Sequence, residues 1–364
     1  MNNKILLRTA AAILAAVLLY PASAGAVGAR SAILLDAQTG RVLYEKSADE
    51  QSLIASTTKI MTALIICEQC NVLDRVRIPR EAVGMEGSSM YLQEGEILTV
   101  QDLLYGLMLS SGNDAAVALA IYCGGTVEGF AQLMNDKVHY LDLQNTHFVN
   151  PHGLDAKDHY STARDLAILA AYAMKNPLFA QTVSTRKVTA AGRYLTNHNK
   201  LLWQVEGADG VKTGYTKAAG RILVSSAVQK GRRLVCVTIH DSNDWTDHAA
   251  LYRDAFAGFT PAQLVSQGDL MGTIPVLGGQ HEKVNVIAAE DFSFALAKGE
   301  QVSFSLSQKG FAYAPVVSGA DCGYAYVCID GKPVGKVRVY YETTIEQIVP
   351  ETKPFWQRIL GGKS

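Results

Sequence analysis

Hydrophobic and polar residues repeat with two different periods along this chain, and the periods predict strands and helices. Residues 29–50 contain two strand-like runs, SAILLD and RVLYEK, which flank the turn AQTG and predict a β-hairpin. The next run, SLIASTTKIMTALII (52–66), is apolar on nearly every side and predicts a buried helix from about Ser56. Lys59 is its single charge, and buried helices rarely carry lysine.

Helical spacing continues downstream and then gives way to strands. Segments with apolar residues at helical spacing are 99–123, 127–143 and 161–176. Ser161 is a suitable N-cap for the last of them. Strand-like runs dominate 208–241, with a hairpin turn near QKGR, and a helix is expected over 244–256. From about residue 262 short alternating strands with Gly-, Asp- and Lys-rich turns predict a small β-sandwich.

The N-terminus carries the features of a secretory signal peptide. Lys4 and Arg8 precede the apolar run TAAAILAAVLLY, and small residues follow Pro21 at two sites suited to cleavage. The alternative is an uncleaved N-terminal anchor. Because no second apolar run approaches the length of a membrane span, we expect the protein to work outside the cytoplasm.

Charge and cysteine content narrow the function further. The chain has 33 Lys and Arg residues against 34 Asp and Glu residues, a near-neutral balance that argues against a nucleic-acid partner. Its six cysteines lack convincing disulfide spacing, so free or buried thiols are favoured over disulfide bonds.

Three short motifs occur in a fixed order. They are Ser56-x-x-Lys59, Ser111-Gly112-Asn113 and Lys212-Thr213-Gly214. A second Ser-x-x-Lys, Ser184 to Lys187, follows Ser-Gly-Asn rather than preceding it and lies in a polar, strand-like stretch, so it does not fit the order. The ordered set is typical of serine penicillin-binding proteins and class A β-lactamases.

The chemistry explains why a lysine occupies the buried helix. A serine is a weak nucleophile until a base removes its proton, and a lysine with an ordinary pKa is protonated. Burial of Lys59 and a second cation, Lys212, would both favour the neutral amine. Lys59 would then be a base able to deprotonate Ser56.

The remaining motif residues have expected roles around this pair. Ser111 would relay a proton to the leaving amine, and Asn113 would hold the substrate amide. Lys212 and Thr213 would bind a terminal carboxylate, while Gly214 would let a peptide lie close to the strand. The expected oxyanion hole consists of the backbone N–H groups of Ser56 and Tyr215.

Together with longer matching segments, these motifs resemble the D-alanyl-D-alanine carboxypeptidase family of low-molecular-weight penicillin-binding proteins. The segments are ASTTKIMTALI, EGSSMYLQEGEILTVQDLLYGLMLSSGNDAA, FVNPHGLDAKDHYSTARDLA, HNKLLWQVEGADGVKTGYTKAAG and LVSSA. Ile54, where the family usually has proline, and Arg221, where an aromatic residue is common, are departures that bear on substrate preference.

The resemblance implies a fold and an activity. The implied fold is an α/β (α+β) serine-acylase domain, a five-stranded antiparallel sheet with packed helices, followed by the β-sandwich. The implied reaction removes the terminal D-Ala of peptidoglycan pentapeptide stems through an acyl-enzyme on Ser56, and β-lactams would acylate the same serine. We expect a signal peptide (1–26), the D,D-peptidase domain (27–261), the β-rich domain (262–345) and a tail (346–364).

Several alternatives remain open. A class A β-lactamase would add a Glu-x-x-x-Asn segment between Asn113 and Lys212, which is absent. A D,D-endopeptidase or a non-catalytic wall-binding protein would share the motifs. His147, His152 and His159 match no zinc spacing and indicate a turn, so no metal or cofactor is expected. Asp114 and Glu68 are expected to be solvated or capping residues.

The tail has an amphipathic pattern. Phe355, Trp356, Ile359 and Leu360 would share a helical face with Arg358 and Lys363 beside it. The residues alone support membrane-surface association and a frayed end that docks on the protein itself equally, and the resemblance, through relatives with amphipathic C-terminal anchors, favours membrane association.

Overall fold

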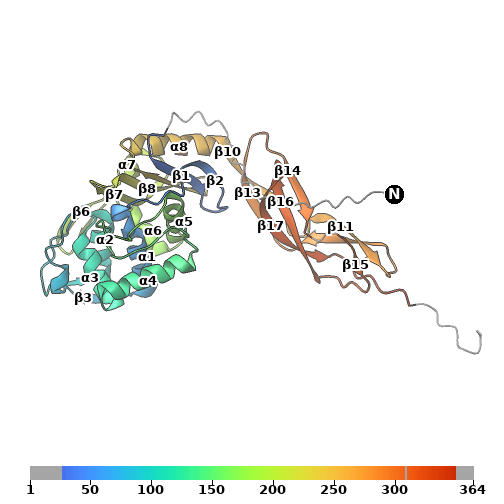
Figure 1. The fold of residues 1–364 in the computed structure, drawn as a ribbon, viewed down its shortest axis with the longest axis horizontal. Helices are drawn as coiled ribbons and strands as arrows, with labels where there is room; N and C mark the ends of the chain where they lie inside the picture. The colour runs from blue at the N-terminus through green and yellow to red at the C-terminus, as the bar shows by residue number, and fades with distance from the viewer. Residues whose placement is uncertain (1–26, 308–309, 350–364) are drawn as a thin grey trace, which may run out of the picture. The chain divides into compact units, whose positions relative to one another are not determined.

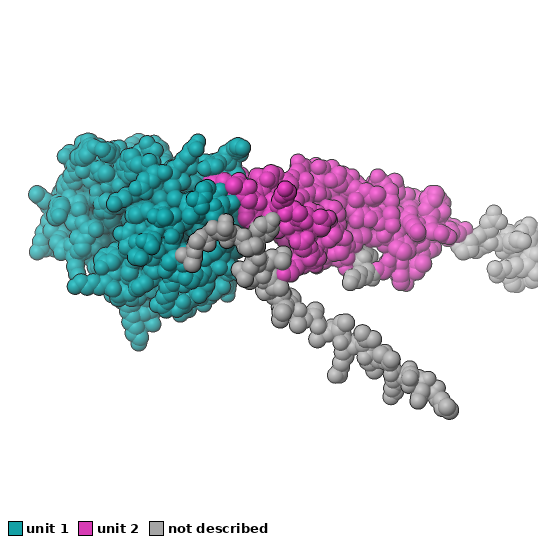
Figure 2. Space-filling view, turned by 90° about the horizontal axis from the view of Figure 1, so that it is seen from above, with its two compact units in different colours: residues 1–37, 42–255 teal, residues 38–41, 256–364 magenta. Residues whose placement is uncertain are grey.

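The computed structural model describes residues 27–307 and 310–349. These residues divide into two compact units, one of residues 27–37 and 42–255 and the other of residues 38–41, 256–307 and 310–349 (Figure 2). The predicted signal peptide, 1–26, and most of the predicted tail, 350–364, lie outside the described residues.

The first unit is built on a five-stranded antiparallel sheet. Its strand order is β2-β1-β9-β8-β7, which places β7 at an edge. The strands are β1 (Ser31–Asp36), β2 (Val42–Lys46), β7 (Ala208–Thr216), β8 (Gly220–Gln229) and β9 (Arg232–Ile239). The predicted hairpin near the N-terminus and the strands over 208–241 are therefore confirmed.

Helices cover both faces of this sheet (Figure 1). One face carries α8 (Asp244–Gly258), and the other carries the main helical layer. That layer contains α1 (Lys59–Gln69), α2 (Val100–Leu109), α3 (Asn113–Gly124), α4 (Val127–Tyr140), α5 (Ala163–Ala173) and α6 (Pro177–Ser184). Side chains alternate across the strands, so Ile222 and Val224 of β8 join the main core while Leu223 and Ser225 face α8.

Helix α1 lies at the centre of the main core. Every residue from Lys59 to Ile66 is buried, which confirms the helix predicted from its apolar run. The turn before it, η1 (Ala55–Thr58), is a single 3₁₀ turn that holds Ser56 at the helix entrance. The motif Ser111-Gly112-Asn113 lies between α2 and α3, as the sequence indicates.

Two local predictions are wrong. Helix α5 is capped by Thr162, whose hydroxyl accepts the Asp165 N–H at 3.1 Å, whereas the Ser161 hydroxyl bonds to Thr146. The cap falls one residue later because Ser161 instead pairs with Ser52 through backbone hydrogen bonds. The polar stretch around Ser184 is also not one strand, since α6 ends there and β5 (Lys187–Ala190) follows.

Shorter elements complete the first unit. They are β3 (Arg75–Arg77), η2 (Arg80–Ala82), β4 (Ile97–Thr99), β6 (Arg193–Thr196) and α7 (Leu201–Gln204). All six cysteines are free thiols, as expected. In the described part of the chain, no single helix is long and apolar enough to cross a membrane. Only α3 and α4 taken together, with a bend of 82° between them, reach the length and apolar composition of a membrane span.

The second unit is all β, which confirms a β-rich C-terminal region. Strands β10 (Phe259–Val265) and β13 (Phe292–Ala297) pair with each other. A six-stranded sheet has the order β14-β16-β17-β12-β11-β15. Its strands are β11 (Leu270–Leu277), β12 (Lys283–Ala288), β14 (Val302–Leu306), β15 (Ala312–Tyr313), β16 (Asp321–Ile329) and β17 (Lys332–Tyr341). Alternate valines and alanines of these strands form a separate core.

A buried histidine links α8 to the sheet and makes the first unit sensitive to acid. His248 is fully buried, and its Nδ1 and Nε2 contact Ser225 Oγ at 2.6 Å and Thr238 Oγ1 at 3.0 Å. Burial lowers the pKa of His248 to about 3. Because the unfolded chain takes up this proton below about pH 6.5 and the folded chain does not, stability falls as pH drops from about 6.5 toward 3.

We expect His248→Gln to remove about 1 kcal/mol of the stability lost between about pH 7 and 5.5. Urea unfolding at the two pH values measures the difference. His139→Gln, at an exposed residue of α4, is the control and should keep the parent's pH dependence. An unchanged pH dependence in His248→Gln would contradict the assignment.

Candidate active site

Ser56 is presented by a strained turn at the entrance to α1. The preceding residue, Ala55, has a positive φ of 45°, which is uncommon for alanine. Lys59 follows one turn later, and its Nζ lies 2.9 Å from Ser56 Oγ. The two residues therefore meet in space, as their spacing in a helix predicts.

The Lys59 amine has no solvent exposure and three oxygen neighbours. They are Ser56 Oγ at 2.9 Å, Asn113 Oδ1 at 2.7 Å and the His152 carbonyl at 2.6 Å. A neutral amine has two N–H donors for the two carbonyl oxygens and one lone pair for the serine O–H. Burial, and then the positive charge of Lys212, hold the pKa of Lys59 well below its usual value. In the neutral form that burial favours, the amine satisfies all three contacts.

Lys212 lies on β7 with 2% of its surface exposed. Its side chain points to the same side of the sheet as α1, and burial lowers its pKa to about 7. Its Nζ donates a hydrogen bond to the Thr213 carbonyl at 3.0 Å. A second cation therefore lies near Lys59, as the sequence predicts.

The loop between α2 and α3 brings Ser111 and Asn113 close to Ser56 and Lys59. Ser111 has a positive φ of 60° and lines the cleft, and its side chain has no hydrogen bond in the described part of the chain. Asn113 uses both of its amide atoms within the protein. Its Oδ1 accepts from Lys59, and its Nδ2 donates to the Glu86 carbonyl. In this structure Asn113 therefore orients Lys59.

Strand β7 passes directly beside Ser56. A Cβ at Gly214 would lie 3.2 Å from the Ile54 carbonyl and 3.3 Å from the Ser56 nitrogen, so only glycine fits without pushing the turn aside. Thr213 and the 65%-exposed Tyr215 flank it and line the cleft. Because β7 is an edge strand, part of its backbone is unpaired and faces this cleft.

The cleft has a volume of about 870 Å³. Its lining residues are Ser56, Ser88, Ser111, Thr196, Asn197, His198, Lys200, Trp203, Thr213, Gly214, Tyr215, Arg221, Ile222, Asp244 and Trp245. No local pattern in the sequence places the segment around His198 or the start of α8 in this cleft. Both are brought in by strands and turns whose contacts depend on the whole fold.

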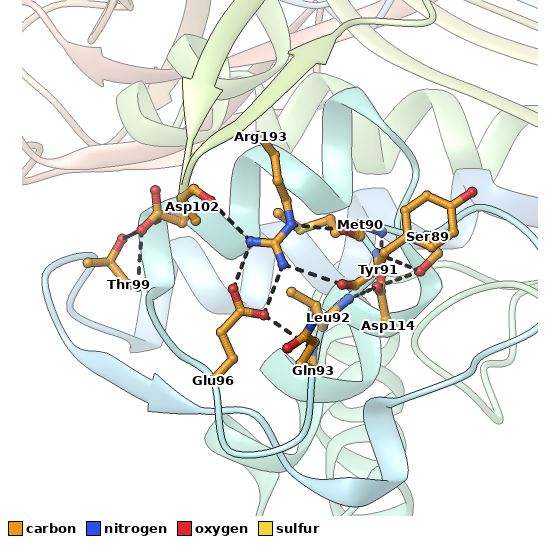
Figure 3. Close-up of polar contacts among 11 residues, drawn as sticks. Ser89, Met90, Tyr91, Leu92, Gln93, Glu96, Thr99, Asp102, Asp114 and Arg193 are labelled. Carbon is orange, nitrogen blue, oxygen red and sulfur yellow. Dashed lines mark hydrogen bonds and ion pairs between the residues drawn. The ribbon is translucent and has the colours of Figure 1, made fainter.

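Asp114 has a structural role that the sequence did not reveal. It is fully buried and accepts hydrogen bonds from Ser89 Oγ at 2.6 Å and from the backbone N–H groups of Met90 and Leu92 (Figure 3). Arg193 clamps the same loop through Glu96 and the Met90 carbonyl. The expectation of a solvated Asp114 is therefore wrong, because the side chain is buried against a loop remote in sequence, whereas a contact of the capping kind is present, since its Oδ1 accepts the Ala115 N–H in the first turn of α3 at 2.8 Å.

The other acidic residue and the histidines also have structural contacts. Glu68 forms an ion pair with Lys137 at 2.7 Å. His159 Nδ1 accepts from the Val149 N–H, so its Nε2–H donates to Thr58 Oγ1 at 2.8 Å. Burial lowers the pKa of His159 to about 4. Among the described residues, no group of three or more His, Cys, Asp or Glu residues is placed to hold a metal ion.

Gly153 fixes the turn that carries Ser56. It has a φ of +88°, and an added Cβ would lie 1.8 Å from the Ala55 carbonyl oxygen. We expect Gly153→Ala to lower stability by about 1–3 kcal/mol through backbone strain alone, with the clash adding to this loss. Gly192→Ala shares the positive φ of +72° but has nothing within 4 Å, so it isolates the strain. Urea unfolding would contradict the role of the clash if the two variants lost the same stability.

Comparisons with known proteins agree with this geometry. The family model described as D-alanyl-D-alanine carboxypeptidase matches residues 20–243, and the model described as penicillin-binding protein 5, C-terminal domain, matches 259–347. The chain is 34% identical over 320 residues to the D-alanyl-D-alanine carboxypeptidase DacF of Bacillus subtilis, covering 84% of this chain and 82% of DacF. It is 36% identical over 290 residues to DacD of Escherichia coli, covering 75% of each.

A solved structure extends the match to the whole fold. Penicillin binding protein 5 of Haemophilus influenzae superposes with a TM-score of 0.77 and 29% identity, covering 89% of this chain and 99% of that chain. Both the peptidase region, 20–243, and the β-rich C-terminal region, 259–347, thus match known families. The chain belongs to the serine D-alanyl-D-alanine carboxypeptidase family of low-molecular-weight penicillin-binding proteins.

Proposed function

We propose that this protein removes the terminal D-alanine from peptidoglycan pentapeptide stems through an acyl-enzyme on Ser56, and that β-lactams acylate the same serine. The observation that carries the proposal is the buried amine of Lys59 at 2.9 Å from Ser56 Oγ, where burial and the charge of Lys212 hold its pKa well below the usual value and favour the neutral form. A base in that state and position can take the serine proton without prior rearrangement.

The proposed reaction has two halves. Lys59 takes the Ser56 proton as Oγ attacks the carbonyl carbon of the penultimate D-Ala, and the backbone N–H groups of Ser56 and Tyr215 stabilise the oxyanion. The proton passes through Ser111 to the leaving nitrogen, the peptide C–N bond breaks, and free D-Ala departs. Lys59 then deprotonates a water that attacks the ester, which restores Ser56 and releases the shortened stem.

The substrate is proposed to lie along the edge of β7. Lys212 and Thr213 bind its terminal carboxylate, and Gly214 allows the peptide backbone to approach. Asn113 holds the substrate amide only if its Nδ2 exchanges the Glu86 carbonyl for the substrate carbonyl, because both amide atoms are occupied in this structure. Ligand binding would therefore be coupled to the 86–96 loop.

The two enzymatic alternatives differ from this proposal in different ways. A class A β-lactamase differs in the base used for deacylation, and a D,D-endopeptidase differs in its substrate. No glutamate is among the described residues that line the cleft, and the carboxylate of Asp244, which does line it, is bound by Arg221, so the lining lacks the free glutamate base that class A β-lactamases use for deacylation. We therefore favour a slowly hydrolysed β-lactam adduct. A D,D-endopeptidase would use the same residues on cross-linked stems, and that substrate distinguishes it.

Export and membrane association are part of the proposal. Residues 1–26 would direct the chain across the membrane, and residues 27–261 would form the D,D-peptidase domain. The β-rich domain, 262–345, would contribute placement, and the tail, 346–364, would lie on the extracytoplasmic membrane surface.

The acyl-enzyme is tested by D-alanine release from a pentapeptide muropeptide. Protein lacking residues 1–26 should release D-alanine and become labelled by a fluorescent penicillin, and Ser56→Ala should lose both to background. Ser184→Ala, in the second Ser-x-x-Lys, is the control and should match the parent. D-alanine release that persists in Ser56→Ala would contradict the mechanism. Absence of release by both the parent and Ser56→Ala would favour the endopeptidase or a non-catalytic role.

The charge of Lys212 predicts that kcat/KM falls at alkaline pH. Because burial lowers its pKa to about 7, the free enzyme loses this cation above neutral pH. We expect kcat/KM for a stem with a free carboxylate to fall about tenfold per pH unit on that side. Lys212→Arg, which stays charged, should remove most of this fall in kcat/KM, whereas His198→Gln should retain it. A parent profile that stays level from pH 7 to 9 would contradict this role.

A further inference from the structure

Arg221 occupies a position in the cleft that the three motifs do not explain. It lies on β8, paired directly with Tyr215 of β7, and it lines the same cleft as Ser56. Residues that face each other across two strands point to the same side of the sheet, and residues two apart along a strand share that side. Thr213, Tyr215 and Arg221 therefore project from one face.

The Arg221 guanidinium is held in place from two sides. Its Nη2 donates to both carboxylate oxygens of Asp244, at 2.6 and 2.8 Å, and the Asp244 side chain is only 3% exposed. The guanidinium also lies over the Trp245 ring, 5.6 Å from its centroid. Asp244 is itself anchored by the Trp245 N–H at 2.9 Å. The planar group is thus oriented before any ligand binds.

Part of this oriented group has no partner. Arg221 has five N–H donors, and within the described residues neither Nε nor Nη1 has a hydrogen-bond acceptor. Its side chain is 43% exposed and lines the cleft. An arginine fork with unused donors in a cleft suits a carboxylate, which accepts two parallel hydrogen bonds.

The strand register places Arg221 within reach of Thr213. Thr213 pairs with Leu223, two residues beyond Arg221 on β8, so Thr213 and Arg221 are diagonal neighbours. Diagonal neighbours on one face are about 7–8 Å apart, a distance that long side chains span. A carboxylate held at the Thr213 hydroxyl would therefore lie within reach of the free edge of the guanidinium.

The charges around the cleft favour the same ligand. Lys200 and Arg221 line it, Lys212 lies just behind Thr213, and Asp244 is the one acidic residue in the lining. Asp244 is already bound by Arg221 and buried, so it repels an incoming anion less than a free carboxylate would. The cleft lining thus has two basic side chains against one acidic side chain, and this excess of positive charge attracts an anionic group.

We infer that Arg221, oriented by Asp244 and Trp245, is a specificity residue that binds the terminal carboxylate of the substrate together with Thr213. This inference rests on the proposed carboxypeptidase function and adds to it a second carboxylate ligand from a different strand. It gives a reason for arginine at a position where the family commonly has an aromatic residue. Lys212 supplies charge from behind the strand, whereas Arg221 supplies directed hydrogen bonds.

The test compares two small peptides with the full-length protein. One is Nα,Nε-diacetyl-L-Lys-D-Ala-D-Ala, whose only charge is its terminal carboxylate, and the other is the same peptide ending in a carboxamide. Charge-assisted hydrogen bonds imply that Arg221→Ala lowers kcat/KM on the acid peptide roughly 10- to 100-fold, chiefly through KM. The carboxamide peptide should change by no more than about twofold, so the preference for the acid collapses.

Three further variants separate the role of the Arg221 guanidinium from general effects of losing an arginine, its packing or its charge. Arg253→Ala removes an arginine from α8 that is 71% exposed and absent from the cleft, and it should behave as the parent. Arg221→Gln keeps much of the packing over Trp245 and should show the same loss of preference if Arg221→Ala folds poorly. Arg221→Lys keeps a positive charge but lacks the two parallel N–H donors of the guanidinium. Its preference for the acid peptide should lie between those of the parent and Arg221→Ala.

The outcomes separate this inference from the proposed function. A parent that hydrolyses the last peptide bond of neither peptide, releasing neither D-Ala from the acid nor D-alaninamide from the carboxamide, refutes the carboxypeptidase proposal. A parent that prefers the acid, with Arg221→Ala and Arg221→Gln preserving that preference, refutes the Arg221 inference alone. An equal loss on both peptides would assign Arg221 to the shape of the cleft or to another part of the stem, and would also overturn the inference.

Discussion

The burial of one amine governs the architecture of the active-site region. Lys59 sits at the first turn of α1, in the middle of the main core, where a charged ammonium would be strongly destabilised. Its amine is accommodated because three oxygens reach it from separate parts of the chain: Ser56 on the adjacent turn, Asn113 at the start of α3 and the His152 carbonyl. Loss of any one would leave a buried polar group unsatisfied.

The same requirement explains why the surrounding loops are tightly constrained. The carbonyl of His152 can reach Lys59 because Gly153 lets its loop pack against the Ala55 carbonyl. The amide of Asn113 is held by Glu86 in a loop that buried Asp114 and the Arg193 clamp organise. Gly214 brings β7 against the Ser56 turn from the other side. Stability and the geometry of the proposed chemistry therefore depend on the same contacts.

Electrostatics divide the site into two parts. On the α1 side of the sheet, burial lowers the pKa of both Lys59 and Lys212, and at Lys59 this favours the neutral amine that proton transfer requires. On the α8 side, Arg221 stays charged and is held by Asp244 and Trp245 next to the open cleft. Lys212 and Thr213 are neighbours on β7 and point to opposite faces of the sheet, so in the proposed function one strand contributes to both parts.

The sequence by itself determined the local elements and the order of the motifs. Hydrophobic periodicity identified the N-terminal hairpin, buried α1, the strands over 208–241 and the β-rich C-terminal region, because each depends on residues close together in the chain. The Ser56–Lys59 contact was also predictable, since a helical turn brings residues three apart together. Only the tertiary structure decided that Asn113 binds Lys59, that Asp114 orders the 86–96 loop, and that Arg221 and Asp244 enter the cleft. These contacts join residues far apart in sequence, and their partners are set by strand register and packing, which no local pattern encodes.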